Sequence, residues 1–90
     1  MEYIYRVHAI ERMFQRDIYE SQVEDVVVNG ETIESYMDDK PYPSFLALGY
    51  ADGLALHVVY AKDEDANVII ITAYRPSLEK WQNDLKTRKV

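Results

Sequence analysis

Two long apolar segments, residues 54–61 and 68–74, constrain the fold of this chain more than any other feature. A polar segment, residues 62–67, separates them. Apolar runs of this length between polar turns predict neighbouring strands at the centre of a sheet. His57 lies in the first run, on the strand face with the smaller neighbours Ala55 and Val59. A histidine in this setting has either a chemical role or a partner that satisfies its ring nitrogens.

The segments before this pair predict the rest of the sheet. Residues 31–36 alternate weakly and predict a first strand, and two prolines make residues 37–44 a loop. Residues 45–50 predict the next strand, which a tight turn at residues 51–53 joins to the strand that contains His57. We therefore expect four antiparallel strands.

Three helices are predicted outside the sheet. Residues 7–14 place four apolar side chains on one helical face, and a polar stripe on the other holds His8, Arg12, Gln15 and Arg16. A capping box from Ser21 to Glu24 predicts a second helix that ends at Gly30. Ser77 after Pro76 predicts the N-cap of a terminal helix through Lys86.

These elements predict an α+β fold of one domain over residues 1–90. Two N-terminal helices precede a four-stranded antiparallel sheet, and a C-terminal helix follows it. A chain of ninety residues is too short to support two separate cores. We expect the helices to cover one face of the sheet and to leave the other partly open for a ligand.

Composition excludes several classes of site. Cysteine is absent, so the chain has no disulfide, thiolate metal ligand or thiol nucleophile. The start lacks the features of a secretory signal, and no uninterrupted apolar run exceeds four residues, so runs such as residues 68–71 are too short to span a membrane. We expect a cytoplasmic protein. A net charge of −6 disfavours loose adhesion to nucleic acid or anionic membrane, so any contact with RNA must be local.

The candidate site residues each have two interpretations. His8 and Arg12 lie one helical turn apart and Arg16 extends the line, which favours phosphate binding, although Arg12 paired with Glu11 or Asp17 on a solvated face fits equally. His57 titrates near neutrality and suits acid or base catalysis, but a structural histidine bonded to a tyrosine fits too. Two histidines without a third ligand predict no metal site.

Aromatic and hydroxyl residues near the strand ends complete the candidates. Tyr42 lies between two prolines, beside Ser44, and either stacks on a base or packs over the sheet edge. Tyr74 and Arg75 flank the end of the last strand. Trp81 is expected to dock the terminal helix on the core.

Several different short motifs are distributed along nearly the whole chain. They are His8-Ala-Ile-Glu-Arg12-Met, Arg16-Asp-Ile, Gly30-Glu-Thr-Ile-Glu, Tyr36-Met-Asp-Asp, Pro43-Ser44, Leu56-His57-Val-Val and Thr72-Ala-Tyr74-Arg-Pro76, followed by Trp81. As a set they resemble a widespread prokaryotic family known only as a domain of unknown function. That family is grouped with the RelE and ParE toxin superfamily and with barnase-like, metal-independent ribonucleases.

The resemblance implies a RelE/ParE-like fold and one composite site. It implies His8, Arg12, His57 and Tyr74 as catalytic residues, with Arg16, Tyr42, Ser44 and Arg75 as substrate contacts. We therefore expect a metal-independent endoribonuclease or toxin-like protein that activates the RNA 2′-hydroxyl and needs no cofactor. The possible partners are RNA and a cognate antitoxin or other protein.

The charge of the chain departs from this resemblance. RelE-like toxins are usually basic, whereas this chain is acidic, and ParE-like members act on a protein instead of RNA. The alternative function is therefore a non-catalytic protein-binding or regulatory module of the same fold, in which the histidines are structural.

Overall fold

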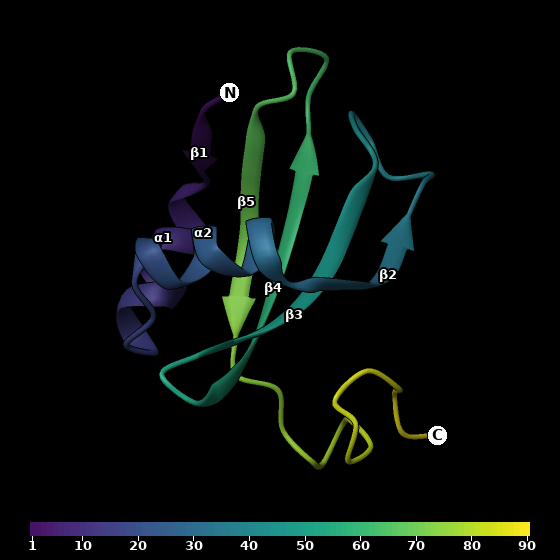
Figure 1. The fold of residues 1–90 in the computed structure, drawn as a ribbon. Coiled ribbons are helices and arrows are strands. Elements are labelled where there is room, and N and C mark those ends of the chain that lie inside the picture. The colour runs from purple at the N-terminus through teal and green to yellow at the C-terminus, as the bar shows by residue number, and fades with distance from the viewer.

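The protein contains a five-stranded mixed sheet and two helices (Figure 1). The computed structural model describes residues 1–90. The strands follow one another across the sheet in the order β1-β5-β4-β3-β2. The elements along the chain are β1 (Tyr3–Tyr5), α1 (Val7–Gln15), α2 (Glu20–Asn29), β2 (Glu31–Tyr36), β3 (Ser44–Ala51), β4 (Leu54–Lys62) and β5 (Val68–Tyr74).

The four predicted strands are confirmed to within one residue at each end. β3 and β4 form the predicted hairpin, and β4 pairs antiparallel with β5. In this register His57 lies opposite Leu48 on one side and Tyr74 on the other. Residues directly opposite one another on neighbouring strands share a face of the sheet. The register therefore brings the rings of His57 and Tyr74 together.

The prediction of a purely antiparallel, four-stranded sheet is wrong. β1 adds a fifth strand at the edge and runs parallel to β5, with Tyr3 opposite Val68. Three residues are too few to show a strand periodicity. β1 also depends on a partner far along the chain, which no local pattern reveals.

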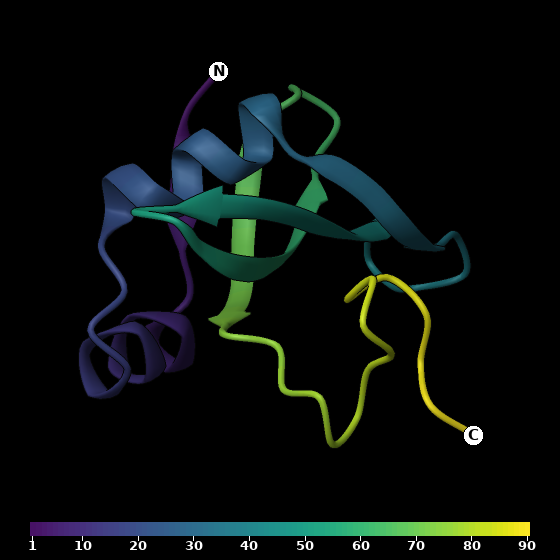
Figure 2. The ribbon, with the colours of Figure 1, turned by 60° about the horizontal axis from the view of Figure 1, so that its bottom comes forward.

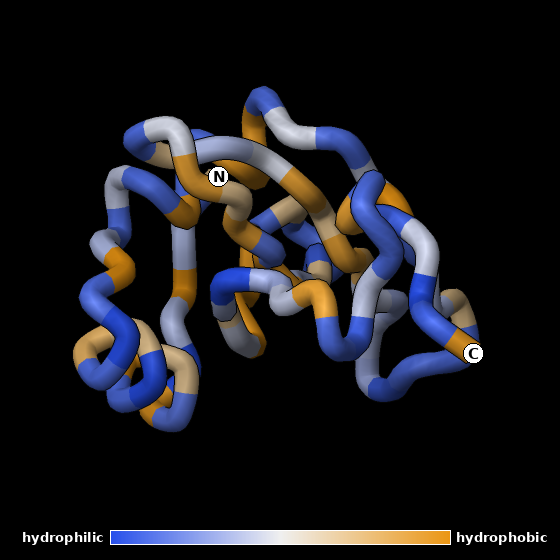
Figure 3. Tube along the Cα trace, turned by 90° about the horizontal axis from the view of Figure 1, so that it is seen from below, coloured by the Kyte–Doolittle hydropathy of each residue, from blue (hydrophilic) through white to orange (hydrophobic).

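Both helices pack on one face of the sheet. Their buried side chains, together with apolar side chains of β3, β4 and β5, form the main hydrophobic cluster. Ala9 and Met13 are the buried residues of α1, whereas Ile10 and Phe14, two of the four apolar side chains on the predicted helical face, are 50% and 85% exposed. The predicted inward face of α1 is therefore partly wrong, and Figure 3 shows apolar and polar residues alternating around this helix.

The N-cap of α2 is Tyr19, two residues before the predicted N-cap Ser21. The amide of Tyr19 donates to Oε1 of Gln22 at 3.0 Å, whereas Glu24 accepts a hydrogen bond from the hydroxyl of Tyr5 at 2.7 Å. The expected capping box at Ser21 is therefore wrong, because Glu24 is used in a tertiary contact instead. No helix in the structure has the length and apolar character needed to cross a membrane.

The predicted C-terminal helix is absent. Residues 77–90, named here the strap, fold back on themselves through a bridge between Trp81 and Arg88. At the turn of the strap, the carboxylate of Asp84 accepts the amides of Lys86 and Thr87 at 2.9 and 3.0 Å. Side-chain bonds of this kind compete with helical backbone bonds, which explains why the helix does not form.

The strap covers part of the sheet face opposite α2. Figure 2 shows α2 and the strap on opposite sides of β3 and β4. Trp81 is only 2% exposed and its ring meets that of His57 edge-on, with centroids 4.6 Å apart. The face that we expected to be partly open is therefore closed at His57.

Candidate functional site

A cleft of about 520 Å³ lies where the end of β5, the end of α1 and the strap meet. Four cationic side chains, two hydroxyl groups and one indole line it. They are Arg16, Tyr74, Arg75, Ser77, Lys80, Trp81 and Arg88. The cleft is named the cationic cleft below.

Three of the four cations in this cleft have no acidic partner. Nη1 of Arg16 donates to the carbonyl of Ala73 at 2.9 Å, and Nη1 of Arg75 donates to the carbonyls of Leu54 and Ala55, each at 3.3 Å. These acceptors are neutral, and no ion pair of the protein involves Arg16, Arg75 or Lys80. The cleft therefore concentrates positive charge within an acidic protein, which favours an anionic ligand.

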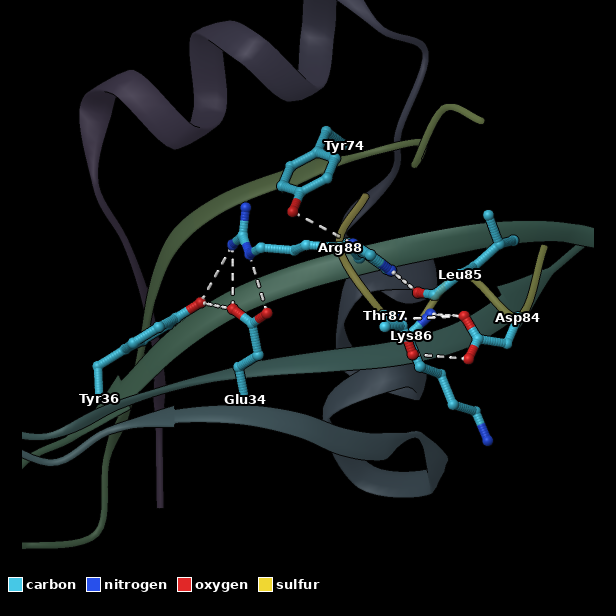
Figure 4. Close-up of polar contacts among 9 residues, drawn as sticks. Glu34, Tyr36, Tyr74, Asp84, Leu85, Lys86, Thr87 and Arg88 are labelled. Atoms are coloured by element: carbon cyan, nitrogen blue, oxygen red, sulfur yellow. Dashed lines mark hydrogen bonds and ion pairs between the residues drawn. The ribbon is translucent and has the colours of Figure 1, made fainter. Parts of the chain in front are cut away.

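Arg88 has a carboxylate partner. Its guanidinium binds Glu34 through two bonds, Nε to Oε2 at 2.9 Å and Nη2 to Oε1 at 3.0 Å (Figure 4). The guanidinium also lies 4.7 Å from the centroid of the Trp81 ring. This bidentate pair holds the pKa of Glu34 below its ordinary value. Together with the contact of Lys86 and Glu31 at 2.8 Å, it fastens the strap to β2.

His57 lies behind the cleft and has no exposed surface. Its Nε2 is 2.8 Å from the carbonyl oxygen of Leu85, and its Nδ1 is 3.2 Å from the hydroxyl of Tyr74. A carbonyl only accepts, so Nε2 carries the proton in the neutral ring. Nδ1 is then the acceptor, and the Tyr74 hydroxyl donates to it.

The local environment keeps this pair neutral. Burial lowers the pKa of His57, although the bond to Leu85 and the charge of Glu34 oppose the shift. Burial raises the pKa of the Tyr74 hydroxyl. Tyr74 lines the cleft whereas His57 does not. A ligand in the cleft therefore meets Tyr74, and His57 can act only through Tyr74.

The structure separates the residues proposed as one catalytic group. Arg16, Tyr74 and Arg75 line the cleft, and His57 lies directly behind Tyr74. The His8 side chain is 87% exposed, 3.9 Å from Glu11, and Arg12 is exposed as well. Neither residue lines the cleft. Direct participation of His8 and Arg12 at this site has no support in the geometry.

The two proposed substrate contacts of the loop before β3 have other partners. The Tyr42 hydroxyl donates to Glu64 at 2.6 Å, and the Ser44 hydroxyl donates to Asp39. Ser44 is only 2% exposed, and neither side chain lines the cationic cleft. These bonds fix the loop and leave no geometric basis for substrate contacts there.

Sequence reasoning did not identify Ser77, Lys80 and Arg88 as lining residues. Ser77 and Lys80 were assigned to the terminal helix and Arg88 to no element, and only the folded strap brings the three beside Tyr74. The concentration of basic residues after Asp84 was the one available signal. No three histidine, aspartate or glutamate side chains gather in a group that would hold a metal ion.

Fold and cleft together define a small α+β protein with a cationic cleft at one end of a mixed sheet. The chain belongs to the family described as a domain of unknown function, DUF4258, whose model matches residues 5–75. A comparison with curated proteins found no significant match, and neither did a comparison with solved structures. Arg16, His57, Tyr74 and Arg75 lie within the family match, whereas the strap lies beyond it.

Proposed function

We propose that this protein binds single-stranded RNA in the cationic cleft and cleaves it by transesterification without a metal ion. The observation that supports this most strongly is the position of Tyr74, which lines the cleft with three cations that lack an acidic partner and whose hydroxyl lies 3.2 Å from Nδ1 of the buried His57. The motifs that resemble a family grouped with metal-independent ribonucleases favour the same reaction.

Arg16 and Arg75 are the proposed phosphate-binding residues. Each uses Nη1 for a backbone carbonyl, which orients the guanidinium and leaves other donors free. An additional negative charge develops on the phosphate as the 2′-oxygen attacks. Fixed cationic donors stabilise that charge more than they stabilise the ground state, so they lower the barrier.

Tyr74 and His57 provide the proposed route for the proton. The 2′-hydroxyl gives its proton to the Tyr74 oxygen while the Tyr74 proton passes to Nδ1 of His57. The 2′-oxygen then bonds to phosphorus, and the bond from phosphorus to the 5′-oxygen breaks. The leaving 5′-oxygen takes the proton back along the same path, so the products are a 2′,3′-cyclic phosphate and a 5′-hydroxyl.

The surroundings of His57 suit this relay. The raised pKa of Tyr74 keeps its proton on the hydroxyl at neutral pH, ready for transfer. Burial lowers the pKa of His57 and keeps the ring neutral before the reaction, whereas the carbonyl of Leu85 and the charge of Glu34 oppose that shift and partly stabilise the transient imidazolium. His57 is therefore a positioning and relay residue, and Tyr74 is the residue that touches the substrate.

A non-catalytic binding module is the second candidate function. His57 is completely buried with both nitrogens bonded, as expected of a structural histidine. In that case the cationic cleft holds an acidic segment of a protein partner, and Tyr74 contributes only a hydrogen bond.

Cleavage of a labelled single-stranded RNA in the presence of chelator tests the proposal. We expect a 2′,3′-cyclic phosphate product, no cleavage where the attacking 2′-hydroxyl is replaced by hydrogen, and a rate about 10² to 10⁴ lower for Tyr74→Phe. Tyr42→Phe is the matched control, because its hydroxyl lies outside the cleft. Equal rates for Tyr74→Phe and the unaltered protein would exclude the relay. Binding of the RNA without any cleavage would favour a non-catalytic module.

A further inference from the structure

A second, apolar cleft of about 370 Å³ lies over α1 and the start of α2. Five of its seven lining residues are hydrophobic. They are Ile10, Met13, Phe14, Ile18 and Tyr19, with Asp17 and Glu20 as the two acidic members. This group of seven residues is named the apolar surface below.

Three apolar side chains of this surface project beyond the core, whereas Met13 and Ile18 are buried in it. Ile10 is 50% exposed, Phe14 is 85% exposed and Tyr19 is 63% exposed, while the neighbouring Met13 is 4% exposed. Met13 and Ala9 already fill the contact of α1 with the main cluster. Phe14 and Ile10, one helical turn apart, therefore have no role in the core. Contiguous exposed apolar side chains of this kind mark interaction sites.

The charges around the apolar surface indicate what it binds. Its charged residues, Asp17 and Glu20, are both acidic, and no cation lines it. A second copy of this chain would bring these carboxylates toward their own counterparts on a protein whose net charge is already −6. A partner with basic residues beside its apolar side chains pairs with them instead.

We propose that the apolar surface binds an amphipathic helix of a protein partner. That helix inserts leucine or aromatic side chains spaced one turn apart between Ile10, Phe14 and Tyr19, and carries lysine or arginine where it passes Asp17 and Glu20. The site is distinct from the cationic cleft, whose nearest lining residue, Arg16, precedes Asp17 in the chain. The inference therefore does not depend on RNA binding.

A synthetic amphipathic helix tests this site directly. The probe is a fluorescein-labelled peptide with leucines along one face and lysines beside them, and its control has glutamates in place of the lysines. Fluorescence anisotropy measures the affinity of each peptide for the intact protein. We expect the lysine peptide to bind at least about tenfold more tightly, and Phe14→Ser to weaken it by about tenfold or more.

Val28→Ser is the matched control variant, since Val28 is 66% exposed and lies on α2 outside the apolar surface. It should leave the affinity unchanged, and Glu20→Gln should weaken only the lysine peptide. Equal binding of the two peptides, or full affinity in Phe14→Ser, would overturn the proposal. Sedimentation that shows a dimer of the unaltered protein, abolished by Phe14→Ser, would overturn it in favour of a second copy.

Discussion

Replacement of Trp81 by alanine tests whether a single side chain holds the strap against the sheet. The indole is 2% exposed, packs edge-on against His57 and supports the guanidinium of Arg88. A large aromatic side chain buries up to ~250 Å², which at ~25 cal/mol per Å² gives an upper bound of ~6 kcal/mol. Truncations of tryptophan in cores usually cost about 3–5 kcal/mol.

We expect a loss of about 3 kcal/mol for Trp81→Ala, at the lower end of that range. The reason is that the strap can detach while the sheet and helices stay folded, so the loss cannot exceed the free energy of docking the strap. Urea unfolding followed by circular dichroism measures this loss. Hydrogen exchange should accelerate at the amides of Gln82 and Lys89, which donate to Thr87 and Lys80 within the strap.

Leu78→Ala is the control for this experiment. Leu78 lies in the same segment but is 55% exposed, so its truncation should cost no more than about 0.5 kcal/mol. A loss below about 1 kcal/mol for Trp81→Ala, with slow exchange at Gln82 and Lys89, would refute the conclusion that the indole holds the strap.

Three further predictions follow from the site and the core. The pKa of His57 is lower in the folded protein than its ordinary value near 6.5, so at a pH below 6.5 the folded ring binds fewer protons than the same ring in the unfolded chain. The free energy of unfolding should therefore decrease as the pH falls through 6.5. Urea unfolding between about pH 5.5 and 7 should show this slope, and a His57→Gln variant with the same slope would contradict it. Arg75→Gln should reduce the magnitude of the slope of log affinity for single-stranded RNA against log salt by about 0.7, whereas the control Arg12→Gln should leave the slope unchanged. An unchanged slope for Arg75→Gln would exclude Arg75 from phosphate binding. Gly49→Ala should lower the free energy of unfolding by about 1–3 kcal/mol, because the Cβ of the new alanine would lie 2.7 Å from Cγ2 of Val26. A thermal midpoint equal to that of the unaltered protein would disprove this clash.

The sheet was predictable where the sequence contains a strong local signal. The strand pair at residues 54–74 has long apolar runs with clear turns, and the observed strands match it closely. β1 has only three residues and no local signal, because its pairing partner lies more than sixty residues away at Val68. Periodicity detects an element from its own side chains, so an edge strand defined by a distant partner escapes it.

Errors in the helices arose from side chains that have partners elsewhere. Glu24 fits a capping box, but the hydroxyl of Tyr5 takes its carboxylate. The segment after Ser77 has a helical pattern, but the carboxylate of Asp84 binds backbone amides and Leu85 adopts a left-handed conformation with φ of 59°. Spacing indicates which side chains share a helical face, whereas the bonds that a carboxylate makes depend on the rest of the fold.

The candidate site was predictable in part for the same reason. The sequence indicated Tyr74, Arg75 and Arg16, which line the cleft, but it grouped them with His8 and Arg12, which do not. Helical spacing places His8, Arg12 and Arg16 on one stripe, yet of these three residues only Arg16, which follows α1, lines the cleft. Arg16 bonds there to the carbonyl of Ala73.

Net charge alone argued against RNA binding, and the structure shows why that argument is incomplete. Four of the ten cationic side chains line one cleft, and only Arg88 among them has a carboxylate partner. Field strength at a site depends on nearby charges, because salt screens those beyond about 10 Å. An acidic protein can therefore present a strongly positive cleft.

The strap links the charge of the cleft to the state of His57. Ser77, Lys80, Trp81 and Arg88 come from the strap, whereas Arg16, Tyr74 and Arg75 come from the part of the chain that matches the family. The carbonyl of Leu85 in the strap also holds the proton of His57 on Nε2 and so makes Nδ1 the acceptor for Tyr74. Detachment of the strap would remove two cations from the cleft and release the histidine tautomer at the same time. On the proposed function, loosening of the strap should therefore weaken phosphate binding, although Arg16 and Arg75 remain, and should disturb proton transfer at the same time.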